Sequence, residues 1–291
     1  MSVWTITYSP DDYQQSRLSE EFANANIDMS FKRLSKFSVI VNKTDQTSII
    51  YDKINYKLPK CVLTRFGSKH SVTVPRHFEY AGIPVINNAD SMLAGRDKFN
   101  AHLRWFSKNI PTPKTILYTT STSVDIIENE IGFPCIVKPN PGSYGNGTHL
   151  CRTKQQFIDH FNMLRALEIK VPLMVQELIP DRAGCDLRVF VVGNKALGAM
   201  ERIGPRLDDI RVLTDGEYGP RAKYKLTDKI ESLAVSAANA VGLEITGVDL
   251  LFDGDSFKIC EVNVCPGFET FEKNCNVNVA KAIVDLVKSK L

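Results

Sequence analysis

The stretch ITGVDLLFDGDSFKICEVN, residues 245–263, predicts a β-hairpin that carries three oxygen-bearing side chains. Two runs rich in β-branched and apolar residues flank Asp253-Gly254, a pair typical of tight turns. Asp249 lies on the first strand, and Glu261 and Asn263 share one face of the second, because side chains alternate along a strand. Carboxylate and amide oxygens are hard ligands that suit Mg²⁺ or Mn²⁺. The stretch therefore predicts a metal site.

The metal site sets a condition on the register of this hairpin. A loop with an odd number of residues, such as Gly254-Asp255-Ser256, places Asp249 opposite Glu261 on one face. A two-residue loop places Asp249 opposite Cys260, on the other face. The alternative is that both acids face solvent on an ordinary sheet, but acids at the centre of apolar strands are unusual. An EF-hand at residues 253–255 is disfavoured, because the ligand pattern of that calcium loop is missing.

A glycine-rich loop, KPNPGSYGNG at residues 138–147, follows the apolar strand 135–137. Glycine lets backbone N–H groups approach anionic oxygens closely, and Lys138 supplies a positive charge. The Gly-Lys-Ser/Thr ending of a P-loop is missing, and residues 148–151 predict a strand where a dinucleotide-binding motif needs a helix. The loop alone fits an ordinary surface loop equally well. As a lid over phosphates, its candidate contacts are Gly142, Ser143, Gly145 and Gly147.

Two further groups of residues could complete a nucleotide site. The backbone edge of the strand VQELI, residues 175–179, could bond an adenine between apolar neighbours, although the run by itself indicates only a core strand. Arginine suits bidentate binding of phosphate or carboxylate, and two of the arginines lie within strongly apolar strands. The candidates are Gln176, Glu177, Leu178 and Ile179 for adenine, and Lys98, Arg188, Arg202 and Arg211 for anionic groups.

The composition is that of a globular protein, with 43% hydrophobic and 24% charged residues. The formal charge of +3 is too small to indicate bulk attraction to nucleic acid or membrane, so we expect neither partner. Seven scattered cysteines without a Cys-x-x-Cys pair disfavour a disulfide scaffold or structural zinc. No secretory leader opens the chain, and no apolar run is long enough to span a bilayer. We therefore expect a cytoplasmic protein with reduced thiols.

The order of predicted elements divides the chain into three parts. Residues 1–90 alternate short strands and helices, which predicts a small N-terminal α/β domain. Residues 91–185 hold a linker helix, predicted over 90–108, and a central lid subdomain with the glycine-rich loop. Residues 186–291 hold two hairpins, two helices and the metal site. The expected apolar face of the linker helix comprises Met92, Leu93, Phe99, Leu103 and Phe106.

In this order the motifs resemble the ATP-grasp superfamily and, within it, the RimK-like glutamate ligases. The resemblance runs from residue 87 to the end of the chain. It implies an α/β (α+β) fold of the ATP-grasp type, with a small N-terminal α/β domain, a central lid domain and a C-terminal antiparallel-sheet domain. The matching motifs are DK (97–98), FPCIVK (133–138), the glycine-rich loop, VQELI (175–179), GCDLRVFVVG (184–193), ER (201–202), TGVD (246–249), EVN (261–263), PGF (266–268) and FEKNCNVNVA (271–280).

The resemblance implies a ligase that uses ATP and Mg²⁺ or Mn²⁺ to join a carboxylate to an amine through an acyl phosphate. The acid is implied to be a small molecule, a peptide or a protein tail, and the amine an amino acid such as glutamate; a homo-oligomer is compatible with the family. By the same resemblance, one or two metal ions would be bound by Asp249, Glu261 and Asn263, with Glu261 bridging.

The resemblance also implies roles for the remaining candidates. Lys98 and Lys138 would contact the α- and β-phosphates, and Asp186 would meet the nucleotide near the ribose. Glu177 and Leu178 would hold adenine through backbone groups. The transferred phosphoryl group and the acyl phosphate would face Arg202 and Arg211.

One departure concerns the loop after Arg211. The family usually has a small polar residue and then asparagine there, whereas this chain has Val212-Leu213. A polar contact near the nucleotide or the substrate carboxylate is thereby lost. Three functions stay open: an amide-forming ligase that adds glutamate, an ATP-binding module of the same fold without catalysis, and an ATP-grasp kinase or ligase of another amino acid. The retained lysine and metal ligands favour the first.

Overall fold

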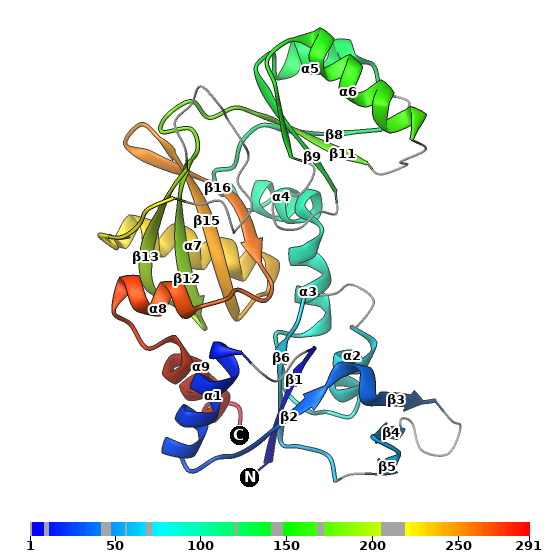
Figure 1. Cartoon of the computed structure of the whole chain (residues 1–291), viewed down its shortest axis with the longest axis vertical. Coiled ribbons are helices and arrows are strands. Elements are labelled where there is room, and N and C mark those ends of the chain that lie inside the picture. Colours follow the sequence, from blue (N-terminus) through cyan, green and yellow to red (C-terminus); the bar gives the residue numbers. More distant parts are fainter. Residues whose placement is uncertain are drawn as a thin grey trace.

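The computed structural model describes residues 2–8, 12–41, 48–55, 57–67, 72–119, 122–140, 148–167, 172–204 and 219–291. Within these segments the strands form four sheets. Two short helices in the middle of the molecule, α3 (Ala89–Arg96) and α4 (Lys98–Phe106), lie between the N-terminal unit and the other sheets (Figure 1). None of the helices in the described segments is long and apolar enough to cross a membrane.

The N-terminal unit is built on a parallel sheet in the order β2-β1-β6-β7, as the predicted alternation of strands and helices requires. The central strands β1 and β6 are buried along nearly their whole length, as strands covered on both faces are, and their buried residues include threonines. The polar edge strand β2 was not predicted. The elements are β1 (Ser2–Thr7), α1 (Tyr13–Asn24), β2 (Asp28–Arg33), η1 (Leu34–Lys36), β6 (Cys61–Arg65), α2 (Thr73–Tyr80) and β7 (Val85–Ile86), with a small antiparallel sheet of β3 (Phe37–Ile40), β4 (Ser48–Tyr51) and β5 (Ile54–Asn55).

The linker differs from its prediction in a way that matters for the site. The single helix predicted over 90–108 is two helices, because the backbone at Asp97 is extended and its side chain caps α4 by accepting from the backbone N–H of Asn100 at 3.0 Å. The break changes the phase of the second helix. Leu103 and Phe106, expected in the core, are therefore 53% and 76% exposed. Leu93, expected on the same face, is 40% exposed as well, although it lies in α3 before the break. The buried residues of α4 are Ala101, His102 and Trp105.

The lid subdomain is an antiparallel sheet in the order β10-β9-β11-β8, covered on its outer face by two helices (Figure 1). A strand follows the glycine-rich loop, as predicted, and this excludes the strand–helix arrangement of a dinucleotide-binding motif. The elements are β8 (Thr115–Tyr118), α5 (Val124–Glu130), β9 (Cys135–Pro139), β10 (His149–Cys151), α6 (Lys154–Ala166) and β11 (Leu173–Glu177).

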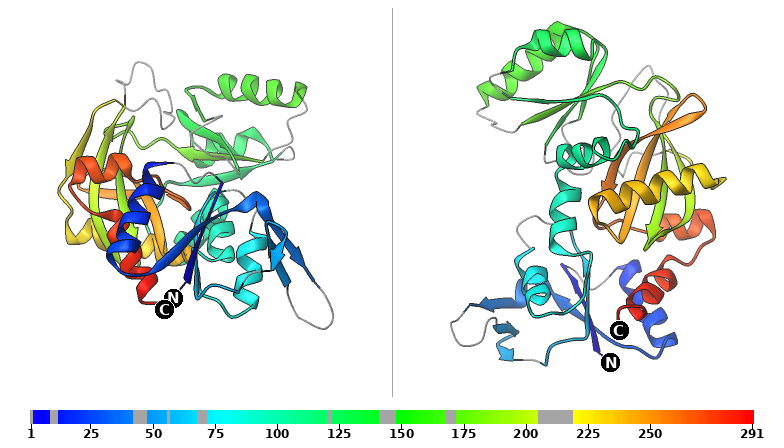
Figure 2. Two further views of the ribbon diagram at one scale, coloured as in Figure 1. Left: turned by 60° about the horizontal axis from the view of Figure 1, so that its bottom comes forward. Right: turned by 180° about the vertical axis from the view of Figure 1, so that it is seen from behind.

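The C-terminal sheet has five antiparallel strands in the order β14-β13-β12-β15-β16, with helices on both faces (Figure 2). The turn between β12 and β13 is Gly193-Asn194, and Thr227 and Gly242 cap the two ends of α7. Three helices, rather than the two expected, follow or flank these strands, because a short helix precedes the final one. The elements are β12 (Cys185–Val192), β13 (Lys195–Ile203), β14 (Arg221–Tyr224), α7 (Asp228–Val241), β15 (Ile245–Asp253), β16 (Ser256–Asn263), α8 (Glu269–Cys275) and α9 (Val279–Lys288).

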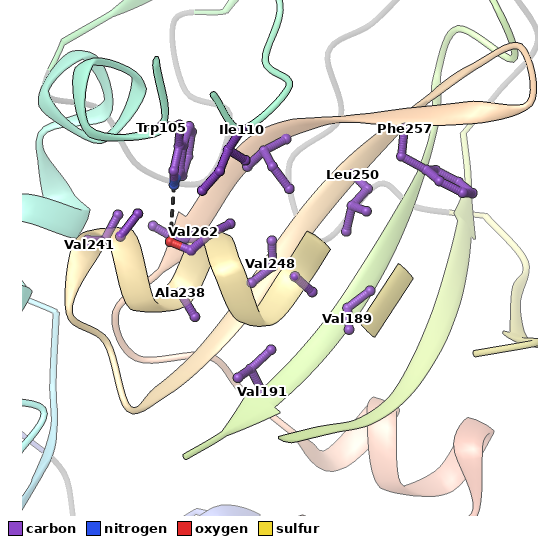
Figure 3. Packing of buried hydrophobic residues seen from close by; sticks show 14 of the residues in the cluster. Trp105, Ile110, Val189, Val191, Ala238, Val241, Val248, Leu250, Phe257 and Val262 are labelled. Carbon is purple, nitrogen blue, oxygen red and sulfur yellow. Dashed lines mark hydrogen bonds between the residues drawn. The ribbon is translucent and has the colours of Figure 1, made fainter. Parts of the chain in front are cut away.

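The core on the α7 face of this sheet also holds α4 (Figure 3). Trp105 is fully buried there, and its indole N–H donates to the backbone carbonyl of Ala237 in α7 at 3.1 Å. The indole thus satisfies its one donor while its rings add apolar area to the cluster. The linker is therefore fixed to the C-terminal sheet rather than free to swing at Asp97.

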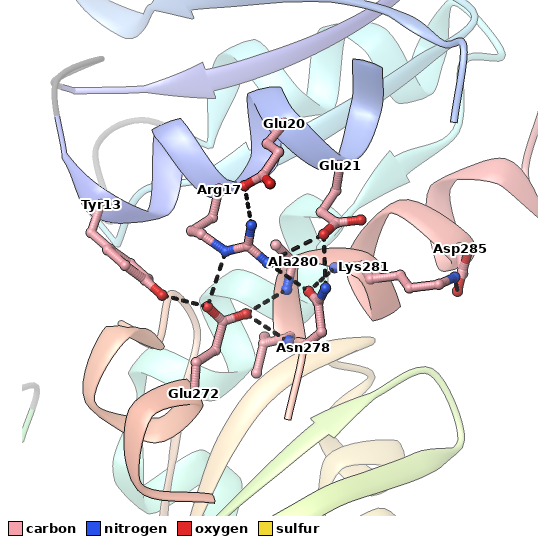
Figure 4. Close-up of polar contacts among 10 residues, drawn as sticks. Tyr13, Arg17, Glu20, Glu21, Glu272, Asn278, Ala280, Lys281 and Asp285 are labelled. Atoms are coloured by element: carbon pink, nitrogen blue, oxygen red, sulfur yellow. Dashed lines mark hydrogen bonds and ion pairs between the residues drawn. The ribbon is translucent and has the colours of Figure 1, made fainter. Parts of the chain in front are cut away.

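The opposite face of the sheet is covered by α8, α9 and α1, and a buried carboxylate joins these helices (Figure 4). Glu272 accepts from the Tyr13 hydroxyl at 2.7 Å and from the backbone N–H of Val279 at 2.7 Å. The first of these bonds comes from the N-terminal unit and the second from the start of α9. Glu272 therefore ties the N-terminal unit to the C-terminal sheet. The domain divisions at residues 90 and 185 stay predictions.

Candidate functional site

The register of the C-terminal hairpin brings the predicted metal ligands together. The turn is the two-residue Gly254-Asp255, so Leu250 pairs with Ile259. One residue further the register shifts, and Asp249 pairs with Glu261. The predicted pairing is therefore confirmed, but the predicted odd loop is wrong. The extra residue is a β-bulge at Cys260, inside the strand.

Asp249 is 2% exposed and is held by two arginines from neighbouring strands. Arg188 binds both carboxylate oxygens, with its Nη2 at 2.9 Å from Oδ2. The Arg202 Nη2 lies 2.9 Å from the same Oδ2. The Asn263 amide also donates to that atom, at 3.3 Å. Such a carboxylate is stable inside a protein only because its charge is paired on several sides.

Asp186 belongs to the same network, because it lies opposite Arg202 in the ladder and two residues before Arg188 on β12. Its Oδ1 accepts from the Arg202 Nε at 2.6 Å. Burial raises the pKa of Asp186, against the opposing pull of Arg202. Burial and Arg202 act to lower the pKa of Arg188, but Asp249 outweighs them and the pKa lies above its ordinary value. Arg188 therefore keeps its charge.

Because Gly247 has no side chain, the Arg188 side chain can pass over it to reach Asp249. A Cβ at this position would lie 2.8 Å from the Arg188 Cδ and 3.2 Å from its Nε. Any side chain would therefore push the guanidinium away from the carboxylate. The sequence motif around Gly247 marked it as part of a family pattern, but nothing in one sequence connects it with Arg188.

Glu261 faces two lysines from other parts of the fold. The Lys98 ammonium, at the start of α4, forms an ion pair with its carboxylate. The Lys138 Nζ, on β9, lies 3.9 Å from the Sγ of the bulge residue Cys260. Burial acts to raise the pKa of Glu261, but Lys98 and Lys138 outweigh it and lower the pKa to about 2. Glu261 is therefore ionised at neutral pH, as a metal ligand must be.

The donor set fits a hard divalent cation. Asp249 and Glu261 are opposed in the ladder, and the Asn263 side chain already contacts Asp249. In the described part of the chain no group of three His, Cys, Asp or Glu side chains is arranged to hold a metal. A metal here would rest on two carboxylates, one amide oxygen and oxygens from a bound phosphate, which is the set that Mg²⁺ prefers.

In the strand predicted to bind adenine, the side chains of Glu177 and Gln176 are hydrogen-bonded to other parts of the protein. Glu177 ends β11, and its Oε1 accepts from the Lys258 Nζ and from the backbone N–H of Lys114, both at 2.9 Å. Burial acts to raise the pKa of Glu177, but the bond from Lys258 outweighs it and the pKa is lowered. Gln176 is buried and donates to the Thr115 hydroxyl at 2.9 Å. Both side chains hold the lid sheet in place, which leaves the backbone of Leu178 and Ile179 beyond β11 for a ligand.

Several predicted contacts lie outside the described residues. They are Gly142, Ser143, Gly145 and Gly147 of the glycine-rich loop, and Arg211, Val212 and Leu213. The described residues that flank the second segment approach each other, since the Gly219 N–H donates to the Ile203 carbonyl at 3.0 Å. The described residues on either side of this segment therefore lie next to the strand end that carries Arg202.

Sequence reasoning missed His102 and Cys260. His102 is 4% exposed on α4, with its ring nitrogens near Thr112, Gln176 and the Cys260 carbonyl. Its partners come from three separate strands or loops, so no local pattern marks it. The signal in the sequence would have been the other face of α4, where His102 lies beside Ala101 and one turn from Trp105.

The chain is similar to known proteins of one family. The family profile of the RimK-like ATP-grasp domain matches residues 95–287. A probable alpha-L-glutamate ligase 2 of Hahella chejuensis (strain KCTC 2396) is 33% identical over 230 residues, covering 78% of this chain and 74% of that protein. A probable alpha-L-glutamate ligase of Legionella pneumophila (strain Corby) is 28% identical over 303 residues, covering 100% of this chain and 96% of that protein.

Two solved structures show the same fold over the whole chain. The ATP-grasp ligase PsnB complexed with minimal precursor has a TM-score of 0.78 at 21% identity, covering 99% of each chain. The D-alanine–D-alanine ligase from Bacillus anthracis has a TM-score of 0.69 at 16% identity, covering 100% of this chain and 97% of that chain. At these identities the likeness concerns the fold alone.

Proposed function

The chain belongs to the RimK-like ATP-grasp family, and we propose that it joins a carboxylate to an amine at the expense of ATP with Mg²⁺. The family, the ATP-grasp fold and the class of ligase that forms carbon–nitrogen bonds were all predicted from the sequence motifs, and the comparisons confirm them. The particular substrates, the metal and the roles of single residues are proposals.

The observation that carries the proposal is the pair of opposed carboxylates, Asp249 and Glu261, which pair with cations from three elements. Arg188 and Arg202 hold one carboxylate, and Lys98 holds the other. Two acids alone would repel each other and a triphosphate. With Mg²⁺ between them and a nucleotide, and with these cations free to bind phosphate oxygens, the charges of the whole assembly balance.

The proposed reaction has two steps. A substrate carboxylate oxygen attacks the γ-phosphorus of ATP, and the bond to the β–γ bridging oxygen breaks, which gives an acyl phosphate and ADP. An amine then attacks the acyl carbon, loses a proton and releases inorganic phosphate to form the amide. Phosphorylation is needed because a free carboxylate has no good leaving group. Bound Mg²⁺ would neutralise charge on the transferred phosphoryl group.

The residues of the chain divide this work by position. Asp249, Glu261 and Asn263 would hold one or two Mg²⁺ or Mn²⁺ ions. Lys98 and Lys138 would move from the hairpin to the α- and β-phosphates. The backbone beyond Glu177 would bind adenine, and Asp186 would lie near the ribose. The transferring phosphoryl group would meet Arg188, Arg202 and Arg211, and the glycine-rich loop would exclude water that could hydrolyse the acyl phosphate.

The proposed substrates are an amino acid, with glutamate first, and a small acid or a peptide. The support is that relatives 28–33% identical to this chain are described as probable alpha-L-glutamate ligases. Val212-Leu213 replaces polar residues of the family in the segment that follows Arg211. A less polar acid than the family's usual one is therefore a sensible part of any substrate panel.

A substrate screen tests the proposal. The chain is incubated with ATP, Mg²⁺ and a panel of acids and amino acids, and ADP release is measured together with the mass of the product. The expected product has the summed mass of acid and amine less one water. Hydroxylamine in place of the amine should trap the acyl phosphate as a hydroxamate. Tight ATP binding without ADP release across the panel would instead support an ATP-binding module without catalysis.

A further inference from the structure

His102 lies where the linker, the lid sheet and the hairpin of β15 and β16, here called the metal hairpin, meet. It belongs to α4, whose first residue, Lys98, pairs with Glu261. Its Nδ1 bonds with the Thr112 hydroxyl, and its Nε2 lies 3.1 Å from the Gln176 side-chain nitrogen and 3.3 Å from the Cys260 carbonyl. The ring therefore contacts β11 of the lid and the bulge of β16 at the same time.

One arrangement of hydrogens satisfies most of these contacts. If Nδ1 carries the proton, it donates to the Thr112 hydroxyl, which in turn donates to the Ile259 carbonyl at 3.1 Å. Nε2 then accepts from Gln176, whose second amide hydrogen goes to Thr115 at 2.9 Å. A proton on Nε2 would oppose the Gln176 N–H and cost the bond to Ile259. In this tautomer the unprotonated Nε2 makes no hydrogen bond to the Cys260 carbonyl, so the ring is linked to β16 through Thr112 and Ile259. The Nδ1–H tautomer is the one that the rest of the network supports.

The ring is held in its neutral form. Burial and the nearby Lys138 lower the pKa of His102 to about 3. A second proton would also point at the Gln176 amide donor. A neutral ring that both donates and accepts is what this chain of hydrogen bonds requires.

The network reaches the residue before the bulge. Ile259 is fixed through its carbonyl by Thr112 and through its N–H by the Pro111 carbonyl at 2.8 Å. From Ile259 the strand must gain one residue at Cys260 before Glu261 can oppose Asp249. Without the bulge the alternation of the strand would turn Glu261 to the other face of the sheet.

We propose that His102 is a positioning residue of the metal site, which links the lid strand β11, through Thr112 and Ile259, to the start of the Cys260 bulge so that Glu261 stays opposite Asp249. This inference rests on the proposed function, because it takes Asp249 and Glu261 as the metal ligands. It adds a residue outside the family motifs. It also couples the lid, through Gln176, to the geometry of the carboxylates.

His77 provides a matched control, since it is also buried, at 3% exposed, and packs edge-on against an aromatic ring, that of Phe78. Within the described segments neither of its ring nitrogens has a hydrogen-bond partner. It lies on α2, away from the hairpin. Replacing His77 therefore repeats the loss of a buried imidazole without touching the network of His102.

The test compares ADP binding with and without Mg²⁺ by calorimetry in His102→Leu, Thr112→Val and His77→Leu. We expect His102→Leu and Thr112→Val to weaken binding of ADP with Mg²⁺ on the order of ten-fold, the usual effect of losing a residue that orients a metal ligand. Binding of ADP without Mg²⁺ should stay near the wild-type value. His77→Leu should change neither. His102→Asn, whose amide nitrogen can replace Nδ1, should restore part of the Mg²⁺ effect.

A merely structural role would lower the melting temperature and leave the Mg²⁺ effect on ADP binding unchanged. That result in folded His102→Leu and Thr112→Val would overturn the proposal. Should His102→Leu fail to fold, Thr112→Val decides alone, because it removes one hydroxyl at nearly constant shape. If the wild-type chain itself bound ADP with no Mg²⁺ effect, the proposed metal site would be wrong, and this inference with it.

Discussion

The Lys98 ammonium, at the first residue of α4, forms an ion pair with the carboxylate of Glu261 near the end of β16. Burial acts to lower the pKa of Lys98, but Glu261 outweighs it and the pKa lies above its ordinary value. In the proposed site, this pair holds the lysine expected to bind phosphate against the carboxylate expected to bind the metal. A cation that binds Glu261 must replace this lysine, which then becomes available to a phosphate.

Replacing Glu261 by glutamine keeps the shape of the side chain and removes its charge. We expect ADP release with substrate to fall by at least about a hundred-fold, since metal ions contribute several kcal/mol of transition-state stabilisation. The rate is measured at saturating Mg²⁺. Glu130→Gln, an exposed acid paired with Lys114, is the control and should keep the wild-type rate. A near-normal rate in Glu261→Gln would reject the metal assignment.

Replacing Gly247 by alanine should displace Arg188 from Asp249. The new Cβ would approach the Arg188 Cδ to 2.8 Å, closer than packing allows. Such overpacking costs about 1–3 kcal/mol, and we expect activity to fall with it because the guanidinium leaves the carboxylate. Urea unfolding gives the change in stability. Gly198→Ala, where a Cβ would meet Phe271 at an ordinary 3.5 Å, is the matched control in the same sheet. Equal effects of the two substitutions would contradict the role of Gly247.

Much of the C-terminal sheet could be predicted from the sequence, because its signals are local. A turn pair such as Gly193-Asn194, or an N-cap such as Thr227, determines the structure of only the few residues next to it. The pairing of Asp249 with Glu261 could also be predicted, from the requirement that metal ligands share a face. How the chain achieves this pairing could not. Cys260 looks like any residue of an apolar strand, and its bulge is fixed by partners more than a hundred residues away in the chain.

The linker shows the same limit. No proline or glycine pair marks the break at Asp97, and the apolar residues of 90–108 fit one continuous helix. The backbone is extended at Asp97 because the Asp97 side chain caps α4 and because Trp105 packs against α7. Because the phase was set wrongly, the predicted apolar face left out His102 and the other residues that α4 buries. The residue that joins the lid to the metal hairpin was missed for this reason.

The depressed pKa of His102 predicts a pH dependence of stability. Above the ordinary histidine pKa of 6.5, the ring is neutral in both the folded and the unfolded chain, and its contribution to the free energy of unfolding is fully present. As the pH falls towards the folded pKa of about 3, the unfolded chain takes up a proton that the folded chain refuses, so stability is lost. The greatest slope for one such group is about 1.4 kcal/mol per pH unit.

His102→Asn should therefore flatten the loss of stability between about pH 5 and 6.5, where most carboxylates are still ionised. The measurement is the free energy of unfolding in urea across this range, compared with the wild-type chain. Burial also lowers the pKa of His77, so His77→Leu reports the share of that second histidine. Parallel curves for His102→Asn and wild type would show that His102 is protonated in the folded state.

Replacing Glu272 by glutamine should separate stability from activity. Its carboxylate accepts from the Tyr13 hydroxyl and from the backbone N–H groups of Val279 and Ala280 at the start of α9, where a negative charge is favoured (Figure 4). Losing the charge should cost about 1.5–3 kcal/mol in the free energy of unfolding, the usual worth of hydrogen bonds to a charged group. Tyr13→Phe and the double variant complete a cycle, in which a non-zero coupling energy confirms the contact between the N-terminal unit and the sheet.

ADP release by Glu272→Gln should stay near the wild-type rate at a temperature where it is folded, since the carboxylate lies among α1, α8 and α9 and not beside Asp249. A folded variant that has lost its activity would show that the N-terminal unit controls the metal hairpin through Glu272.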